Sequence, residues 1–202
     1  MTLARRIRKL LLILLLAECV YLLLVNVALY LPVTQDLVNR IRPDKFQVSW
    51  ERAWSWYPTR VHARGVSVDG QSRSQQWQAQ APEASASIAL LPLVMKRVWV
   101  SDVRAIDLDY RQRPRLKPDK DYSRKLPHFP AIADREVVPV GQVNPKKSSP
   151  WHIEVDDISA SGEHSFWIYG LRGAARGELS GSLTYRTRGG PFSLDLDKLD
   201  LE

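Results

Sequence analysis

The feature that most constrains this chain of 202 residues is an apolar run near its N-terminus. The run extends from Leu10 to Leu31 and is closed by Pro32. About 20 apolar helical residues cross a hydrocarbon core of roughly 30 Å. The positive-inside rule then places the N-terminus in the cytoplasm and residues 32–202 across the membrane, because four basic residues precede the run: Arg5, Arg6, Arg8 and Lys9.

Two other kinds of export segment fit this run less well. A cleaved signal peptide has a shorter apolar core that ends at an A-x-A-like site, whereas cleavage after Ala28 would leave Asn26 at the −3 position. A lipoprotein signal needs a small residue before the modified cysteine, and here Glu18 precedes Cys19. We therefore expect an uncleaved, single-pass signal-anchor.

Two polar side chains, Glu18 and Asn26, lie within the predicted span. An intramembrane carboxylate is costly and marks a functional-site candidate. The alternative is a protonated Glu18 that is hydrogen-bonded to a neighbouring helix or to headgroup water. Both side chains are also suited to bonds with a partner membrane protein.

Composition narrows the class of the exported region. The chain carries 29 Lys and Arg against 22 Asp and Glu, a net charge of +7, but much of that excess precedes the membrane run. The exported part is only mildly basic, so nucleic acid is not an expected partner. One cysteine excludes an intramolecular disulfide framework and a Cys-based zinc site. The 13 prolines argue against an all-helical bundle.

Four exported segments share the pattern apolar-x-apolar-x-x-apolar-x-apolar. Strand side chains alternate between faces, so the extra central residue turns the second half of each segment over unless the strand bulges there. With a bulge, the apolar residues stay on one face. We therefore predict bulged strands at Val61-Ala63-Val66-Val68, Val98-Val100-Val103-Ala105, Ile153-Val155-Ile158-Ala160 and Leu194-Leu196-Leu199-Leu201.

The chain divides into four predicted parts. Residues 1–31 are the basic tip and the anchor. Residues 32–110 form the first part of a β-domain. Residues 111–150 hold seven prolines and are strongly basic, which predicts a loop that is either solvated or in contact with anionic headgroups. Residues 151–202 are predicted as antiparallel hairpins, with Gly189-Gly190 at a turn.

Two short helices are expected within residues 32–110. The first has Thr34 as its N-cap and places Leu37, Val38 and Ile41 on one face. The second is the apolar stretch 90–95, which is predicted to form a short helix or turn that caps the sheet.

Catalytic motifs are missing from the sequence. We find no G-x-S-x-G, no P-loop, no dinucleotide fingerprint and no H-E-x-x-H. His152 and Glu154 would share a strand face and His164 follows Glu163, which allows a metal site, but exposed strand positions commonly carry such residues. We expect no enzyme, no metal and no cofactor; a membrane-bound hydrolase that depends on His152 is the weakest of three hypotheses.

Two further groups of residues have a structural and a functional interpretation. Asp195, Asp197 and Asp200 alternate with leucines, which favours a polar outer face over a pair of glycosidase carboxylates. The tryptophans at 50, 54 and 56 could stack a sugar, but packing in a core or at the membrane interface is preferred.

The arrangement resembles the N-terminal region of AsmA-like proteins, which are anchored in the inner membrane of Gram-negative bacteria. Three features carry the resemblance: the signal-anchor, the stretch from Leu90 to Tyr110, and the Gly-punctuated segment from Gly170 to Leu201. Ala105-Ile106-Asp107 lacks the family's usual proline. The resemblance implies an antiparallel, taco-shaped β-sheet whose apolar groove carries phospholipid acyl chains between the envelope membranes, with the C-terminal region in the periplasm.

The residues expected to line such a groove are Val66, Val68, Val100, Val103, Ile106, Leu108, Ile153, Val155, Ile158, Leu194 and Leu196. The same residues would equally line a closed core. About ten strands at ~4.8 Å spacing are too few to bridge the envelope. We therefore expect either the N-terminal part of a longer protein or one that works with a partner. The alternative function is an anchored assembly scaffold that pairs its sheet edge with a partner chain.

Overall fold

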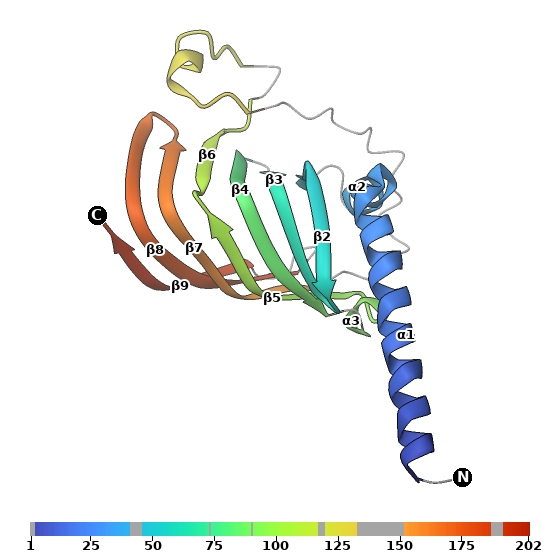
Figure 1. Ribbon diagram of the computed structural model, residues 1–202. Helices are drawn as coiled ribbons and strands as arrows, with labels where there is room; N and C mark the ends of the chain where they lie inside the picture. The colour runs from blue at the N-terminus through green and yellow to red at the C-terminus, as the bar shows by residue number, and fades with distance from the viewer. Residues whose placement is uncertain are drawn as a thin grey trace.

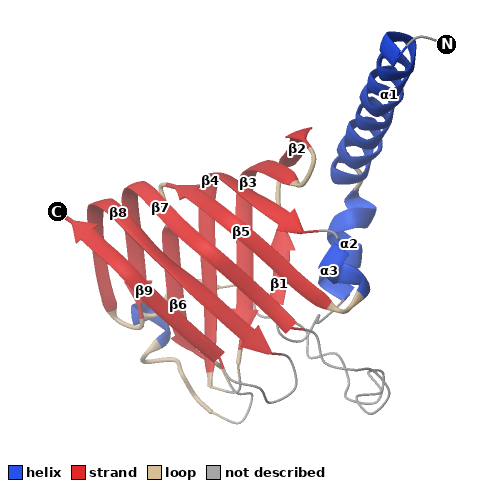
Figure 2. Cartoon of the chain, turned by 90° about the horizontal axis from the view of Figure 1, so that it is seen from below, coloured by secondary structure: helices blue, strands red, loops and turns tan. Residues whose placement is uncertain are grey.

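The computed structural model describes residues 3–40, 46–72, 74–89, 91–116, 120–132, 152–186 and 192–202. A long helix projects from one corner of a single curved sheet (Figures 1 and 2). The sheet contains nine strands. The fold is therefore mainly β with one N-terminal apolar helix, as the sequence predicts.

The helices are α1 (Leu3–Tyr30), α2 (Pro32–Arg40), α3 (Leu91–Val94) and the 3-10 helix η1 (Leu126–His128). Within α1, Arg5–Tyr30 is long and apolar enough to cross a membrane, and none of the residues in its most apolar window is buried. Thr34 is not the N-cap of α2 but lies inside it, where its hydroxyl donates to the Ala28 carbonyl at 2.5 Å. Leu37 is exposed and Val38 half-buried, and Ile41 lies outside the described residues.

The strands follow the order β1-β3-β4-β5-β7-β8-β9 across the sheet. Two positions in this order are each filled by two successive strands. β2 continues β1 along β3, and β6 continues β5 between β4 and β7. Their bounds are β1 (Phe46–Ser49), β2 (Arg52–Tyr57), β3 (Arg60–Gln71), β4 (Gln75–Ala89), β5 (Arg97–Ile106), β6 (Asp109–Pro114), β7 (His152–Ile168), β8 (Leu171–Arg186) and β9 (Phe192–Leu201).

The pairing is mixed where the sequence predicts an antiparallel sheet. β5 and β6 both run parallel to β7, and the other neighbours are antiparallel. Parallel neighbours need a crossover of a dozen or more residues, and the Pro-rich stretch between β6 and β7 supplies that length. The stretch starts later than predicted, because β6 extends to Pro114.

The predicted bulges are present at three of the four patterned segments. In β5 and β7 the extra residues are Asp102 and Asp157, whose φ angles of 49° and 51° are left-handed, and the pairing register shifts beside them. In β9 the register shifts between Leu196 and Lys198. Each bulge lets the apolar residues on both sides face the same way. In β3, Gly65 adopts a φ of 60°, but the register to β4 does not shift.

A line of irregular backbone crosses the sheet and accompanies its curvature. Gly162 of β7 is paired with Gly177 of β8, and both have positive φ angles, 107° and 154°. A Cβ on Gly162 would lie 2.2 Å from the Asp107 carboxylate, and one on Gly177 would lie 1.9 Å from the Asp200 carbonyl oxygen. Only glycine fits these two positions. The long strands curve strongly in Figure 1.

Little of the sheet is covered. The accessible area is 14420 Å², whereas a compact monomer of this mass exposes about 9,700 Å². Among the described residues, the buried hydrophobic side chains are Ala53, Ala81, Ile132 and Ala160. The described chain is therefore a single curved layer with a projecting helix, not a closed two-layer core.

Candidate functional site

Apolar residues from neighbouring strands lie in register and form rows across one face of the sheet. Ile88 of β4 pairs with Val100 of β5, Val100 with Val155 of β7, and Val155 with Leu183 of β8. A second row contains Val103, Ile158 and Gly181. Directly opposed residues project to the same face. We call this side, from Ile88 to Leu183 and from Val103 to Gly181, the apolar face.

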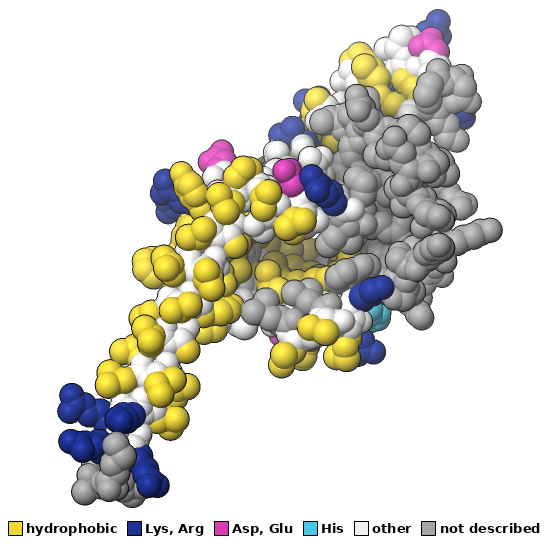
Figure 3. Space-filling model, turned by 90° about the vertical axis from the view of Figure 1, so that its right-hand side faces the viewer, with side chains coloured by type: hydrophobic (Ala, Val, Ile, Leu, Met, Phe, Trp, Pro, Cys, Tyr) yellow, Lys and Arg dark blue, Asp and Glu magenta, His cyan; other side chains and the backbone are white. Residues whose placement is uncertain are grey.

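The side chains of the apolar face are neither buried nor isolated. Val100, Val103, Val155, Ile158 and Leu183 are all half-buried. Apolar side chains are visible inside the hollow beside α1 in Figure 3. Hydrophobic side chains that touch one another but keep part of their surface open form a surface on which apolar groups bind favourably.

Of the predicted lining residues, Val100, Val103, Val155 and Ile158 form these rows, and Ile153 pairs with Val98 in a third row. Val66 pairs with Ala81 and Val68 with Ala79, as a separate set of apolar pairs on β3 and β4. Leu194 and Leu196 are in register with Leu183 and Gly181, but their side chains lie outside the described part of the chain. Leu108 lies between β5 and β6 and is half-buried.

Ile106 does not belong to the apolar face. It pairs with Glu83 of β4, whose carboxylate accepts a hydrogen bond from Arg64 on the polar side of the sheet, and it is 44% exposed. The strand pleat places Ile106 out of phase with Val103. The positive φ of Asp107 (55°) then separates Ile106 from the next strand.

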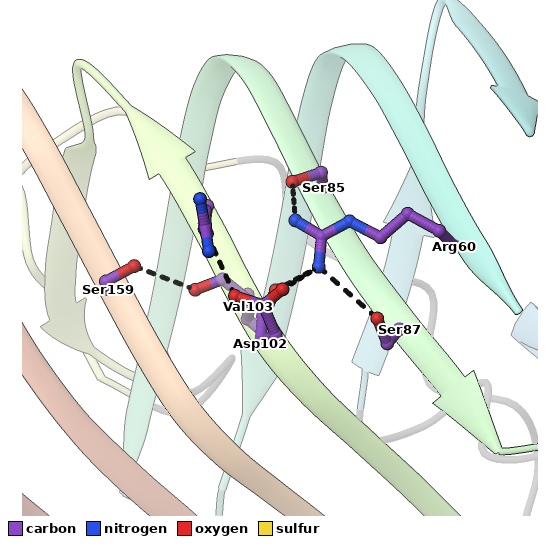
Figure 4. A network of polar contacts seen from close by, with 7 residues as sticks. Arg60, Ser85, Ser87, Asp102, Val103 and Ser159 are labelled. Atoms are coloured by element: carbon purple, nitrogen blue, oxygen red, sulfur yellow. Dashed lines mark hydrogen bonds and ion pairs between the residues drawn. The ribbon is translucent and has the colours of Figure 1, made fainter. Parts of the chain in front are cut away.

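The opposite face carries a polar network centred on Arg60 (Figure 4). The Arg60 side chain, 8% exposed, forms an ion pair with Asp102. It also donates to the Ser85 hydroxyl at 2.7 Å, the Ser87 hydroxyl at 3.3 Å and the Asp102 carbonyl at 3.1 Å. Arg104 donates to the same carboxylate at 2.8 Å. This network joins β3, β4 and β5 at the bulge.

The network also sets the protonation of Asp102. The hydrogen bond from Arg104 lowers the pKa of this carboxyl most. Desolvation opposes it, and the charge and hydrogen bond of Arg60 add smaller effects that lower the pKa again. The carboxylate therefore stays ionised at the bulge. The pKa of Tyr110 changes in the opposite direction: burial raises it most, and the neighbouring Tyr169 raises it further.

The helices contact the sheet through amide side chains at its first edge. Asn26 of α1 donates to the Ser55 carbonyl and accepts from the Ser55 N–H, both at 2.9 Å. Asn39 of α2 does the same with Val48, at 3.0 and 2.7 Å. Each carboxamide thus imitates the backbone of a neighbouring strand. The partner expected for Asn26 is this chain's own edge strand rather than a second membrane helix.

Glu18 and Cys19 of α1 are both exposed. The tryptophans differ from one another. The Trp50 indole donates to the Leu29 carbonyl of α1 at 3.3 Å, Trp54 stacks on His62, and Trp56 is 72% exposed.

The histidines considered as metal ligands have other roles in the structure. Both ring nitrogens of His164 are used by backbone groups, the Leu108 N–H at 3.2 Å and the Gly177 carbonyl at 3.3 Å. His152 lies 3.9 Å from Glu154. No group of three or more His, Cys, Asp or Glu side chains converges within the described residues.

The apolar helix α3 does not cap the sheet. Leu91 and Val94 are 85% and 87% exposed, and Met95 beside them is also exposed. A contiguous apolar stretch predicts a cover for the sheet, but these side chains are open to solvent. Their exposure creates a second apolar surface at the end of the sheet, separate from the apolar face.

Comparisons with known proteins leave the family open. Neither a scan against family models nor searches of curated proteins and of solved structures find a match to this chain.

Proposed function

We propose that this chain is a membrane-anchored, non-enzymatic protein that binds the acyl chains of phospholipids on the apolar face of its sheet. The observation that carries the proposal is the set of in-register apolar rows through β4, β5, β7 and β8 that remain half-exposed. An acyl chain laid across these rows would remove apolar surface from water at roughly 25 cal/mol per Å². The likeness to AsmA-like proteins supports the same ligand class.

The charge pattern at the N-terminus supports an orientation. The basic residues before the span favour a cytoplasmic N-terminus, so the sheet would lie in the periplasm of a bacterial inner membrane. Lipid leaving that membrane would meet the sheet directly, because α1 contacts its first edge through Asn26.

Lipid co-purification from the full chain tests this function. Ile158→Asp puts a carboxylate on the apolar face, whereas Ser180→Asp puts one on the polar side, in register with Lys198. The phospholipid retained per protein, measured by mass spectrometry of detergent-solubilised samples, should fall in the first variant and stay at the wild-type level in the second. Equal lipid content in all three proteins would contradict lipid binding by this face.

A second candidate function rests on the last strand. β9 pairs with β8 along one side, and its other side meets no strand among the described residues. An open edge can accept a strand of another chain. Under this scaffold function, proline substitutions at exposed positions of β9 would abolish a complex while lipid content stays unchanged.

A further inference from the structure

The exposed apolar side chains at the α3 end of the sheet gather on two neighbouring segments. One is the end of β2, with Trp56 and Tyr57 exposed at 72% and 53%. The other is α3 with Met95. The segments are joined through the backbone, because the Ile88 N–H donates to the Thr59 carbonyl at 2.9 Å, three residues before α3 begins. We call these residues together the apolar rim.

The contacts with α1 fix the height of the apolar rim relative to the predicted membrane span. The Thr59 N–H donates to the Tyr21 hydroxyl at 3.5 Å. Ser55, four residues before Thr59 in the chain, is hydrogen-bonded to Asn26 of the same helix. Tyr21 lies ten residues before Leu31, the end of the apolar run, and ten helical residues rise by roughly 15 Å. That depth is about half of a hydrocarbon core of ~30 Å.

The sheet therefore cannot stand clear of the membrane if α1 spans it. In Figure 1 the tip of β2 and α3 lie at the height of the middle of α1. Residues at this height meet acyl chains rather than water. The exposed side chains there are apolar or aromatic: those of Trp56 and Tyr57, and those of Leu91 and Val94 in α3.

We propose that the apolar rim inserts into the lipid leaflet from which α1 emerges and forms a second membrane contact of the chain. The occupant of this surface is the bilayer itself. Insertion would tilt one end of the sheet into the leaflet while the far end of the β7–β8 hairpin stays in water. The proposal depends on α1 spanning the membrane, but it holds whether or not the apolar face binds lipid.

Depth-dependent fluorescence in the full chain tests this contact. In a Cys19→Ser background, Val94→Cys and Tyr57→Cys place a thiol on the rim. Leu171→Cys places one on an equally apolar and exposed residue (65%) at the far end of the β7–β8 hairpin. Each thiol is labelled with nitrobenzoxadiazole, and the proteins are reconstituted in vesicles of phosphatidylethanolamine and phosphatidylglycerol with or without a lipid that carries a spin label on its acyl chain.

We expect the probes at positions 94 and 57 to emit at shorter wavelength, several-fold more brightly, and to be quenched by the spin-labelled lipid, while the probe at position 171 stays water-like. Water-like emission at position 94 or 57 would overturn the proposal. Quenching at position 171 would also overturn it, because the sheet would then lie flat on the membrane. None of these outcomes depends on lipid retained by the apolar face, so failure here is distinct from failure of the proposed function.

Discussion

The two faces of the sheet are satisfied in different ways. On the polar face, charged and hydroxyl groups meet partners within the chain, as Arg60 does with Asp102, Ser85 and Ser87. On the apolar face, Val100, Val155 and Leu183 touch their row neighbours but keep part of their surface open. The difference teaches that the polar face is complete in the single chain, whereas the apolar face gains free energy only when something apolar covers it.

Deleting Asp157 should have the largest effect on stability, because the deletion mixes apolar and polar side chains on each face of the sheet. Without the bulge, Ile153 and Val155 turn to the side opposite to Ile158, since a one-residue slip flips every side chain beyond it. We expect a loss of more than ~4 kcal/mol in unfolding free energy, seen as loss of folded protein by circular dichroism.

The matched control is Asp157→Asn, because asparagine tolerates the left-handed φ of 51° at this position. The free energy of unfolding of this variant should lie within ~0.5 kcal/mol of the wild-type value. A deletion variant that melts like the control would show that the bulge does not hold the faces apart.

The polar face is tested next by Arg60→Met. The methionine keeps an apolar stem but removes the donors to Ser85, Ser87 and Asp102, and we expect a loss of about 2–3 kcal/mol. Arg64→Met, which breaks an exposed pair with Glu83, should cost less than ~1 kcal/mol. Equal melting temperatures for the two variants would contradict the claim that the Arg60 network stabilises the polar face.

The edge between helix and sheet is tested by Asn26→Leu. The variant loses both bonds to Ser55, which we expect to cost about 1–2 kcal/mol and to speed hydrogen exchange at the backbone of β2. Leu24→Ala, at an exposed position of α1, should leave that exchange unchanged. Unchanged exchange in Asn26→Leu would mean that α1 and the sheet are held together elsewhere.

Acid should have the smallest effect. The pKa of Asp102 is lowered in the folded chain, first by the hydrogen bond from Arg104. Its contribution to stability is therefore present above the ordinary carboxyl value of 3.8 and is lost as the pH falls through the lower folded value. Because the carboxylate is half-exposed, we expect less than ~1 kcal/mol. In Asp102→Asn, the free energy of unfolding should fall less steeply at acidic pH than in the wild type. An unchanged fall would mean that other carboxyl groups cause the loss of stability in acid.

The local pattern in the sequence predicts the bulges well, because a bulge follows from the phase of apolar residues within one strand. An aspartate at each bulge of β5 and β7 also agrees with the tolerance of this residue for positive φ. Ile106 lies off the predicted face, because the phase of the strand changes between it and Leu108. That change depends on Asp107, whose carboxylate accepts from the Glu163 N–H of β7, a contact between residues far apart in the sequence.

Other features could not be read from single segments. The parallel pairing of β5 with β7 depends on where the long crossover returns the chain. The contacts of Asn26 and Asn39 with edge strands depend on how α1 and α2 lie along the sheet. The apolar composition of α3 predicts that it covers the sheet, and only the three-dimensional arrangement places it at the rim with its side chains exposed.

Photo-crosslinking at two adjacent positions of β7 tests the central claim most directly. A p-benzoylphenylalanine is introduced in the full chain at position 155, in the row of Val100 and Leu183, or at position 154, in register with Trp99 and Thr184 on the other face. After irradiation of intact membranes, the account predicts phospholipid adducts at position 155 and none at position 154. Equal adduct formation at the two positions, or adducts at neither, would contradict lipid binding by the apolar face.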